Sequence, residues 1–257
     1  MKRFVTAALL IPGVTYLVFY GHPFLFIFLV ALVATFCFHE FGRLSGEAGA
    51  YLNFPLGFLA GNLLIWMPTY DPVLLVLPIV LAMAWNLRSG DVGAVLPKTA
   101  ALALAVVYCF GPWRCARELR VIGPHWLLFA LAINWVGDVA AYYVGSRFGR
   151  RKLAPVISPG KSWEGAAASV AASVLFGLAF LGRFAPDRGW LEVAALSAVA
   201  NAAGQVGDLS ESALKRGAGV KDSGTLLPGH GGWLDRVDSS LFALPVVYLW
   251  LSHRVIW

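Results

Sequence analysis

Residues 23–39 read PFLFIFLVALVATFCFH and contain no Asp, Glu, Lys or Arg. Such a run is typical of a membrane-spanning helix, since about 20 mainly apolar residues cross the hydrocarbon core of a bilayer. Lipid offers the backbone no hydrogen bonds, so each run of this kind is expected to be helical. Outward from residues 23–39, similar runs lie near 4–20, 51–68, 72–87, 99–113, 125–146, 165–184, 190–210 and 239–256.

These runs predict an all-α fold, a polytopic integral membrane helical bundle with about nine transmembrane helices. Of the 257 residues, 59% are hydrophobic and 13% are charged, and the mean hydropathy is +0.71. Soluble proteins contain about 45–50% apolar and about 25% charged residues. A soluble enzyme, a disordered chain and a disulfide scaffold are therefore excluded. The three cysteines lie in or beside apolar runs and are interpreted as small hydrophobic residues.

Positive charge predicts the orientation in the membrane. The chain has 20 Lys and Arg residues and 14 Asp and Glu residues. With about nine spans, most of the cations collect on the side of the N-terminus, and cation-rich loops usually face the cytoplasm. Anionic lipid headgroups explain this basic balance, so no nucleic acid partner is expected. Glu40 and Arg43, just after the quoted run, are interpreted as residues of the membrane boundary rather than of a catalytic site.

The N-terminus begins Met1-Lys2-Arg3 and continues into an apolar run, which resembles a signal peptide. No small-residue cleavage site follows the run, so we expect it to remain as the first transmembrane helix.

Two long polar stretches, 147–164 and 211–238, interrupt the apolar pattern. Two predicted helices separate them, so both are expected at one face of the membrane, the cytoplasmic face. We therefore divide a single integral membrane domain into N-terminal transmembrane helices, 1–122, and a C-terminal catalytic region, 123–257, that carries both loops.

Residues 205–238 read QVGDLSESALKRGAGVKDSGTLLPGHGGWLDRVD and concentrate ionisable groups in a chain that otherwise avoids them. Acids and cations in near balance suit a site for Mg²⁺ and a polyphosphate. Mg²⁺ prefers oxygen ligands, commonly one or two carboxylates with substrate phosphates, and Lys and Arg neutralise the remaining phosphate charge. The acids are Asp208, Glu211, Asp222, Asp235 and Asp238, and the basic residues are Lys215, Arg216, Lys221, His230 and Arg236.

A polar stripe is predicted on the helix that precedes this loop. Its members follow one another at steps of four and three residues, which places them on one helix face. Asp208 lies there within an apolar run, where an ionisable residue is costly and is a functional candidate by default. A polar contact between helices is the alternative interpretation. The stripe consists of Asn201, Gln205, Asp208, Ser212 and Lys215.

The loop PGHGG at 228–232 allows backbone N–H groups to approach an anion closely, although such residues also form ordinary turns. His230 is interpreted first as a phosphate contact, with a general base and a turn residue as alternatives. Asp235 and Asp238 follow directly, where capping and the helix dipole also favour acids. That role can account for Asp238, whereas we favour a ligand role for Asp235 because cations crowd it.

The other polar stretch follows Asp138, an acid within an apolar run, and includes the sequence SPGKSWEG at 158–165. This octapeptide combines a turn, a cation, hydroxyls, an aromatic ring and an acid, a mixture that suits a nucleotide base and phosphates. Ser162 is equally typical of a helix cap, with Glu164 near the helix start. The candidates for substrate binding here are Asp138, Ser158, Lys161, Ser162 and Glu164.

The residues from 212 to 238 resemble the signature of the phosphatidate cytidylyltransferase family, also called CDP-diacylglycerol synthases. The resemblance rests on SALKR at 212–216, KDSG at 221–224 and LPGHGGWLDRVD at 227–238. Trp233 departs from the signature, since an aliphatic residue is expected there.

Two further stretches resemble landmarks of the same family. They are residues 138–149 and residues 158–165, in which Ser162 stands where Thr is expected.

The resemblance implies transfer of the cytidylyl group of CTP to phosphatidate, giving CDP-diacylglycerol and pyrophosphate, in membrane phospholipid biosynthesis. The lipid phosphate would attack the α-phosphorus of CTP in line, without a covalent enzyme intermediate. Catalysis would then consist of positioning and charge neutralisation. The resemblance further implies Mg²⁺ with a second cation, a homodimer, and a bacterial-type inner or cell membrane with the active site facing the cytoplasm.

The same resemblance assigns roles to residues. It makes Asp208 and Asp235 the metal ligands, with Asp222 and Asp238 as second choices that bind the metal or fix nearby cations. The remaining catalytic candidates are Lys215, Arg216, Lys221, His230 and Arg236. The substrate-binding candidates are Asp138, Ser158, Lys161, Ser162, Glu164, Ser212, Gly231 and Gly232.

Two rival functions are considered. A CTP-dependent polyprenol or phytol kinase would use the same nucleotide but transfer its γ-phosphate to an alcohol, and the long signature at 212–238 disfavours it. A cation- or proton-coupled transporter would use Asp138 and Asp208 inside the membrane. That reading predicts inverted repeats, which the sequence does not display, and it leaves the charged loop unexplained.

Overall fold

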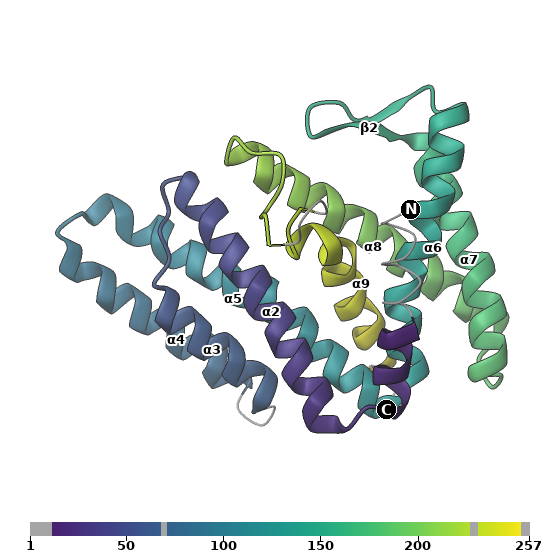
Figure 1. Cartoon of the computed structure of the whole chain (residues 1–257), viewed down its shortest axis with the longest axis horizontal. Helices are drawn as coiled ribbons and strands as arrows, with labels where there is room; N and C mark the ends of the chain where they lie inside the picture. The colour runs from purple at the N-terminus through teal and green to yellow at the C-terminus, as the bar shows by residue number, and fades with distance from the viewer. Residues whose placement is uncertain (1–11, 68–70, 227–230, 253–257) are drawn as a thin grey trace.

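A computed structural model of the chain describes residues 12–67, 71–226 and 231–252 (Figure 1). These residues form an almost entirely helical protein, as predicted. Residues 12–20 are helical, and a single 3₁₀ turn, η2, covers Leu87–Ser89. The longer helices are α2 (Pro23–Glu47), α3 (Phe54–Trp66), α4 (Asp71–Asn86), α5 (Val92–Ile122), α6 (Pro124–Phe148), α7 (Trp163–Phe184), α8 (Trp190–Gly217) and α9 (Leu234–Ser252).

The sheet within the described ranges is a small hairpin between α6 and α7. Strands β1 (Lys152–Ala154) and β2 (Ser158–Ser162) pair antiparallel, with Lys152 opposite Ser162. The predicted polar stretch 147–164 is therefore an ordered hairpin that projects from one end of the bundle (Figure 1).

Four of the described helices, α2, α5, α6 and α7, are long and apolar enough to cross a membrane. Helices α3 and α4 are apolar but shorter. The protein is therefore an integral membrane protein built as a helical bundle. The number of nine transmembrane helices stays a prediction, and the first predicted run, 4–20, lies partly outside the described residues.

The helices extend beyond the apolar runs that predicted them. Helix α2 continues to Glu47 and α8 continues to Gly217, so the predicted loop 211–238 begins as helix, and its irregular part starts at Ala218. The reason is that hydropathy marks the part of a helix that suits lipid, whereas the helix ends where its backbone hydrogen bonds end. The ion pair between Glu211 and Lys215, one turn apart, supports the last turns of α8.

Helices α8 and α9 lie in the middle of the bundle, with α2 to α5 on one side and α6 and α7 on the other (Figure 1). Helix α9 packs against α8, α5 and α6, and α8 packs against α7. Phe38, Phe110 and Phe129 are completely buried in the apolar core. The chain segment with the predicted site therefore lies at the centre of the protein.

A polar seam joins α6, α7 and α8 within the bundle. The Asn201 amide donates to Ser169 Oγ at 3.1 Å, and the Gln205 amide donates to Asn201 Oδ1 at 2.8 Å and to the Ala166 carbonyl at 3.2 Å. For Asn201 and Gln205 the alternative interpretation of the stripe, a polar contact between helices, is therefore confirmed. Gly137 of α6 faces this seam and permits the close approach that small residues allow between membrane helices.

Gly137→Ala is expected to destabilise the bundle. A Cβ atom at this position would lie 2.5 Å from Ser169 Oγ and would also overlap the Asn201 amide. Overpacking of this kind costs about 1–3 kcal/mol, more than the ~0.5–1 kcal/mol by which Ala favours a helix. The measurement is thermal unfolding of the purified protein in detergent. Gly182→Ala in α7 is the matched control, because nothing lies within 4 Å of its Cβ position. Equal melting temperatures for both variants would contradict the prediction.

Candidate active site at the polar end of the bundle

The two polar stretches meet at the same end of the bundle, as predicted. The end of α2, the β1–β2 hairpin, the end of α8 and the start of α9 all lie there (Figure 1). Lys161 of the hairpin places its Nζ atom 2.5 Å from Asp208 Oδ2 on α8. This ion pair joins two segments that are separated by the whole of α7.

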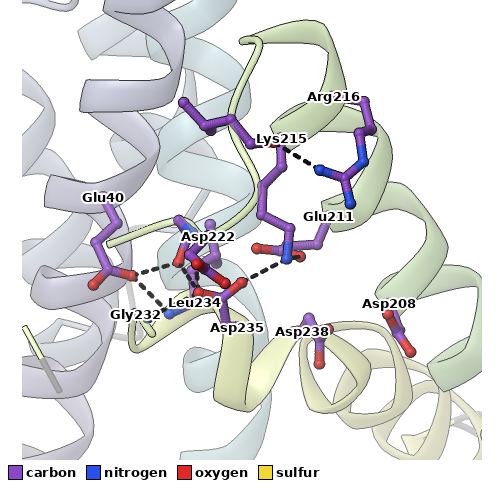
Figure 2. A network of polar contacts seen from close by, with 12 residues as sticks. Glu40, Asp208, Glu211, Lys215, Arg216, Asp222, Gly232, Leu234, Asp235 and Asp238 are labelled. Carbon is purple, nitrogen blue, oxygen red and sulfur yellow. Dashed lines mark hydrogen bonds and ion pairs between the residues drawn. The ribbon is translucent and has the colours of Figure 1, made fainter. Parts of the chain in front are cut away.

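Lys215 connects the last turns of α8 to the first turn of α9. Its side chain lies between those of Glu211 and Asp235 (Figure 2). The Nζ atom is 2.5 Å from Glu211 Oε2 and 2.5 Å from Asp235 Oδ1. The side chains of Lys215, Glu211 and Asp235 are only 11%, 0% and 10% exposed. Two buried carboxyl groups therefore share one ammonium group, and burial raises the pKa of Glu211 to about 8 although the Lys215 ammonium opposes this rise. Glu211 Oε1 has no hydrogen-bond partner among the described residues, so that ammonium is its principal compensation.

The loop that precedes Asp235 donates three hydrogen bonds to one of its carboxylate oxygens. Its Oδ2 atom accepts hydrogen bonds from Ser223 N at 3.0 Å, Ser223 Oγ at 2.9 Å and Gly232 N at 2.8 Å. Burial opposes ionisation of this carboxyl, but the Lys215 ammonium and these hydrogen bonds outweigh it and lower the pKa of Asp235 to about 2. The Gly232 N–H group thus approaches Asp235, an acid in the first turn of α9, and the binding of a phosphate by this loop stays a prediction.

A second group of acids lies beside this one. Asp138 of α6, Asp208 of α8 and Asp238 of α9 interact electrostatically with one another. Asp138 is about 15 Å along α6 from the end of that helix, so the group extends below the polar surface of the bundle. Asp238 Oδ1 accepts hydrogen bonds from the backbone and hydroxyl of Ser239. These bonds do not cap α9, and Asp238 instead lies toward the α8 acid (Figure 2).

Ser162 and Glu164 fix the junction between the hairpin and α7. The Ser162 hydroxyl accepts from Gly165 N at 3.2 Å and caps α7, which is the alternative interpretation of the sequence. The Glu164 carboxylate accepts from Arg150 N at 3.1 Å and from Arg151 N at 3.3 Å, which closes the base of the hairpin. Both residues therefore hold Lys161 in place, and their roles in substrate binding stay predictions.

The other predicted site residues surround these two groups of acids. Arg216 donates to the Val220 carbonyl at 3.0 Å and stabilises the end of α8. Gly231 has a left-handed backbone with φ of 77°, which suits glycine. His230 lies outside the described residues. Lys221, Asp222 and Arg236 are exposed, and Ser158 and Ser212 are partly buried.

Glu40 and Arg43, interpreted from the sequence as residues of the membrane boundary, contact this region, and these contacts were not predicted from the sequence. The Glu40 side chain is buried and accepts hydrogen bonds from Ser223, Trp233 and Leu234. Arg43 donates to the Ser223 carbonyl at 2.7 Å. The signal in the sequence was an acid and a base one helical turn apart at the end of an apolar run, which places both on one face of a continuing helix.

The acids of the site suit a hard divalent cation. Within the described ranges, no three His, Cys, Asp or Glu side chains converge into a ready-made metal cluster. Mg²⁺ does not need one, because one or two carboxylates with substrate phosphates complete its shell. Asp208 and Asp235 each bind a lysine ammonium at 2.5 Å, which marks both carboxylates as cation-attracting positions. The donor set is oxygen only, as Mg²⁺ prefers.

Comparison with known proteins identifies the family. The sequence model of the cytidylyltransferase family matches residues 1–253. The chain belongs to the cytidylyltransferase family. The family resemblance inferred from residues 212–238 is therefore confirmed.

Curated relatives of this cytidylyltransferase-family chain are phosphatidate cytidylyltransferases. The protein of Brucella suis is 46% identical over 123 residues, 48% of this chain and 45% of the relative. The protein of Bacillus subtilis is 39% identical over 154 residues, 59% of this chain and 57% of the relative. That of Staphylococcus aureus is 42% identical over 134 residues, 52% of each chain. The chain spans about half the length of the curated relatives it matches.

Lys215→Met is expected to destabilise the site strongly. The variant leaves the buried carboxylates of Glu211 and Asp235 without their shared ammonium. Removing one partner of a buried ion pair costs about 3–5 kcal/mol, since the remaining charge stays desolvated. Thermal unfolding in detergent measures the effect. Lys221→Met, which removes an exposed cation from the same segment, is the control and should leave the melting temperature nearly unchanged. A similar loss in both variants would refute the buried triad.

Proposed function

We propose that this membrane protein transfers the cytidylyl group of CTP to phosphatidate and releases pyrophosphate, which produces CDP-diacylglycerol for phospholipid biosynthesis. The observation that carries the proposal is the fold of the signature segment around Lys215 and Asp235 at the polar end of a membrane bundle. The family match and the names of the curated relatives support the same reaction.

The position of the site suits one soluble and one lipid substrate. CTP is soluble in water, whereas phosphatidate stays in the bilayer with its phosphate at the headgroup level. The two groups of acids and lysines extend from the exposed loop to Asp138, inside the membrane-spanning helix α6. A site at this depth admits a nucleotide from water and a lipid phosphate from the side of the bundle.

The proposed chemistry is a direct displacement. A phosphate oxygen of phosphatidate forms a bond to the α-phosphorus of CTP, and the bond from that phosphorus to the bridging oxygen of the β-phosphate breaks. Pyrophosphate leaves with the electrons of the broken bond. The protein then needs to align the two phosphates and neutralise their charge, because phosphoryl-transfer chemistry requires little covalent help.

Within this proposal the cations of the site bind phosphates. Lys161 contacts Asp208 and Lys215 contacts Asp235. Each ammonium group has three donors, so each lysine is able to bind phosphate oxygens in addition to its carboxylate partner. We assign phosphate binding to Lys215, Arg216, Lys221, His230 and Arg236. We assign nucleotide and lipid contacts to Asp138, Ser158, Lys161, Ser162, Glu164, Ser212, Gly231 and Gly232.

Asp208 and Asp235 are the residues that we propose to hold Mg²⁺ together with a second cation, and Asp238, which interacts electrostatically with Asp208, is the second choice as a ligand. When bound, the metal ion supplies positive charge to the phosphate oxygens during the transfer. Asp222 is proposed to assist by fixing the neighbouring cations. The alternation of oxygen ligands and ammonium groups at the site supports this assignment.

Turnover of purified protein in detergent tests the proposal. With Mg²⁺, phosphatidate and CTP labelled at the α-phosphate, we expect label in the lipid phase, and its loss on addition of EDTA. Asp208→Asn and Asp235→Asn should each lower the rate about 100-fold or more, because each weakens metal binding and so takes away positive charge that neutralises the reacting phosphates. Asp187→Asn is the control, since its exposed carboxylate lies at the other end of α7 and should not matter.

The rival functions give different results in the same assay. Label from the γ-phosphate of CTP in a polyprenol, without label from the α-phosphate in phosphatidate, would establish a kinase instead. Folded protein that labels no lipid but carries ions across liposome membranes would establish a transporter.

We further propose that the protein is a homodimer in a bacterial cell membrane and that the site faces the cytoplasm. Exposed cations between the end of α6 and the start of the hairpin support this orientation, because cytoplasmic loops are rich in Lys and Arg. They are Arg147, Arg150, Arg151 and Lys152. The family resemblance supports the dimer, and the composition gives no reason to expect a nucleic acid partner.

Labelling of introduced cysteines tests the orientation. Val156 at the tip of the hairpin is 88% exposed, and Asp187 marks the opposite end of α7. In a Cys115→Ser background, in which Cys37 and Cys109 are buried, a membrane-impermeant maleimide should label Val156→Cys in inverted vesicles but not in spheroplasts. Asp187→Cys should show the reverse pattern. The opposite result for both positions would place the site outside the cytoplasm.

A further inference from the structure

We propose that Glu40 of α2, assisted by Arg43, is a positioning residue for the cytidylyl transfer. In this proposal, which rests on the proposed function, Glu40 fixes the backbone on both sides of the glycine-rich loop and so determines where Asp235 stands. The residue lies in the N-terminal half of the chain, far in sequence from the family signature, and it contacts that signature directly (Figure 2).

Each oxygen of Glu40 receives a hydrogen bond from the signature segment. Glu40 Oε2 accepts from Ser223 Oγ at 2.9 Å and from Leu234 N at 2.9 Å, and Oε1 accepts from Trp233 N at 3.0 Å. The residue is only 2% exposed. A buried carboxylate is costly unless hydrogen bonds compensate it, so the burial of Glu40 depends on these three hydrogen bonds together.

Ser223 links Glu40 to the proposed metal ligand. Its Oγ atom is 2.9 Å from Glu40 Oε2 and 2.9 Å from Asp235 Oδ2. A serine hydroxyl carries one proton and can donate it to only one acceptor at a time. Glu40 therefore competes with Asp235 for the hydrogen bond of the Ser223 hydroxyl. Whenever this hydroxyl donates to Glu40, a lone pair of Asp235 Oδ2 becomes available to another partner.

Two glycines of the segment, Gly224 and Gly232, leave the space that the Glu40 carboxylate occupies. A Cβ atom at Gly224 or Gly232 would lie 2.6 Å from Glu40 Cδ and would overlap its oxygens. Only a residue without a side chain allows the backbone to approach the carboxylate this closely. Gly232 also donates its N–H group to Asp235, so the same backbone turn contacts both acids.

Arg43 binds the backbone just before the glycine-rich loop, at residues 222–223. Its guanidinium donates to the Ser223 carbonyl at 2.7 Å and to the Asp222 carbonyl at 3.4 Å. Glu40 and Arg43 lie one turn apart on α2 and therefore face the same direction. One helix face thus holds residues 222–223 and 233–234 together, which leaves the carboxylate of Asp235 in a single position.

Glu40→Gln tests the inference, with Glu47→Gln as the matched control. Both variants remove one carboxylate from α2, but Glu47 is exposed at the end of the helix. A glutamine at position 40 cannot accept hydrogen bonds at both ends of its amide. We expect kcat to fall at least about 10-fold and the Mg²⁺ concentration for half-maximal rate to rise at least about 3-fold. Glu47→Gln should match the wild type in both quantities.

Hydrogen exchange provides a readout that does not depend on turnover. In Glu40→Gln, one accepting oxygen becomes an NH₂ group, so either the Trp233 or the Leu234 backbone amide loses its acceptor. Peptides covering residues 221–236 should therefore exchange faster while the remaining helices exchange as in the wild type. Ser223→Ala should reproduce part of the kinetic change. The double variant should be no slower than Glu40→Gln alone, because both substitutions break the same link.

The outcomes separate the inference from the proposed function. An unchanged kcat and an unchanged Mg²⁺ requirement in Glu40→Gln would overturn the positioning role. The positioning role would also be overturned if the rate falls only in proportion to a loss of folded protein, which the melting temperature measures. If the wild-type protein makes no CDP-diacylglycerol, the proposed function fails on its own. Faster exchange confined to residues 221–236 would then still establish that Glu40 holds the segment.

Discussion

The shared ammonium of Lys215 is the interaction on which the rest of the site depends. Glu211 is completely buried, and burial of a carboxylate is costly unless a close cation or hydrogen bonds compensate it. Because the same ammonium also binds Asp235, the last turns of α8 must lie beside the first turn of α9. Residues 232–234 are then held at the polar end of the bundle, where Gly232 N donates to Asp235 and Leu234 N donates to Glu40.

Close packing of α6, α8 and α9, with α7 against α6 and α8, produces the second group of acids. Small residues such as Gly137 let α6 approach the polar seam on α7 and α8, and α9 packs against α8 from the other side. Asp138, Asp208 and Asp238 are thereby brought within electrostatic reach of one another. Like charges at such a site repel, and Lys161 from the hairpin offsets part of that repulsion. The hairpin is therefore part of the charge balance of the site.

Much of this arrangement was predictable from sequence because it is encoded locally. Apolar runs marked the helices, and the density of charge at 205–238 marked the site. The end of α8 was not predictable from hydropathy, since residues 211–217 are polar yet helical. The contact between Glu40 and Ser223 joins positions 183 residues apart. Local patterns carry no information on such pairs, so an acid at the end of an apolar run was assigned to the membrane boundary.

The two lysine–carboxylate pairs differ in a way that bears on how the site receives a polyphosphate. Lys161 and Asp208 are 26% and 31% exposed, whereas Lys215 and Asp235 are 11% and 10% exposed. Water and dissolved ions screen the more exposed pair, so it is the weaker one and the easier one to separate. The buried pair carries the fold of the loop and is costly to break. The chain therefore separates a rigid part, built on Lys215, from an adaptable part, built on Lys161, within one site.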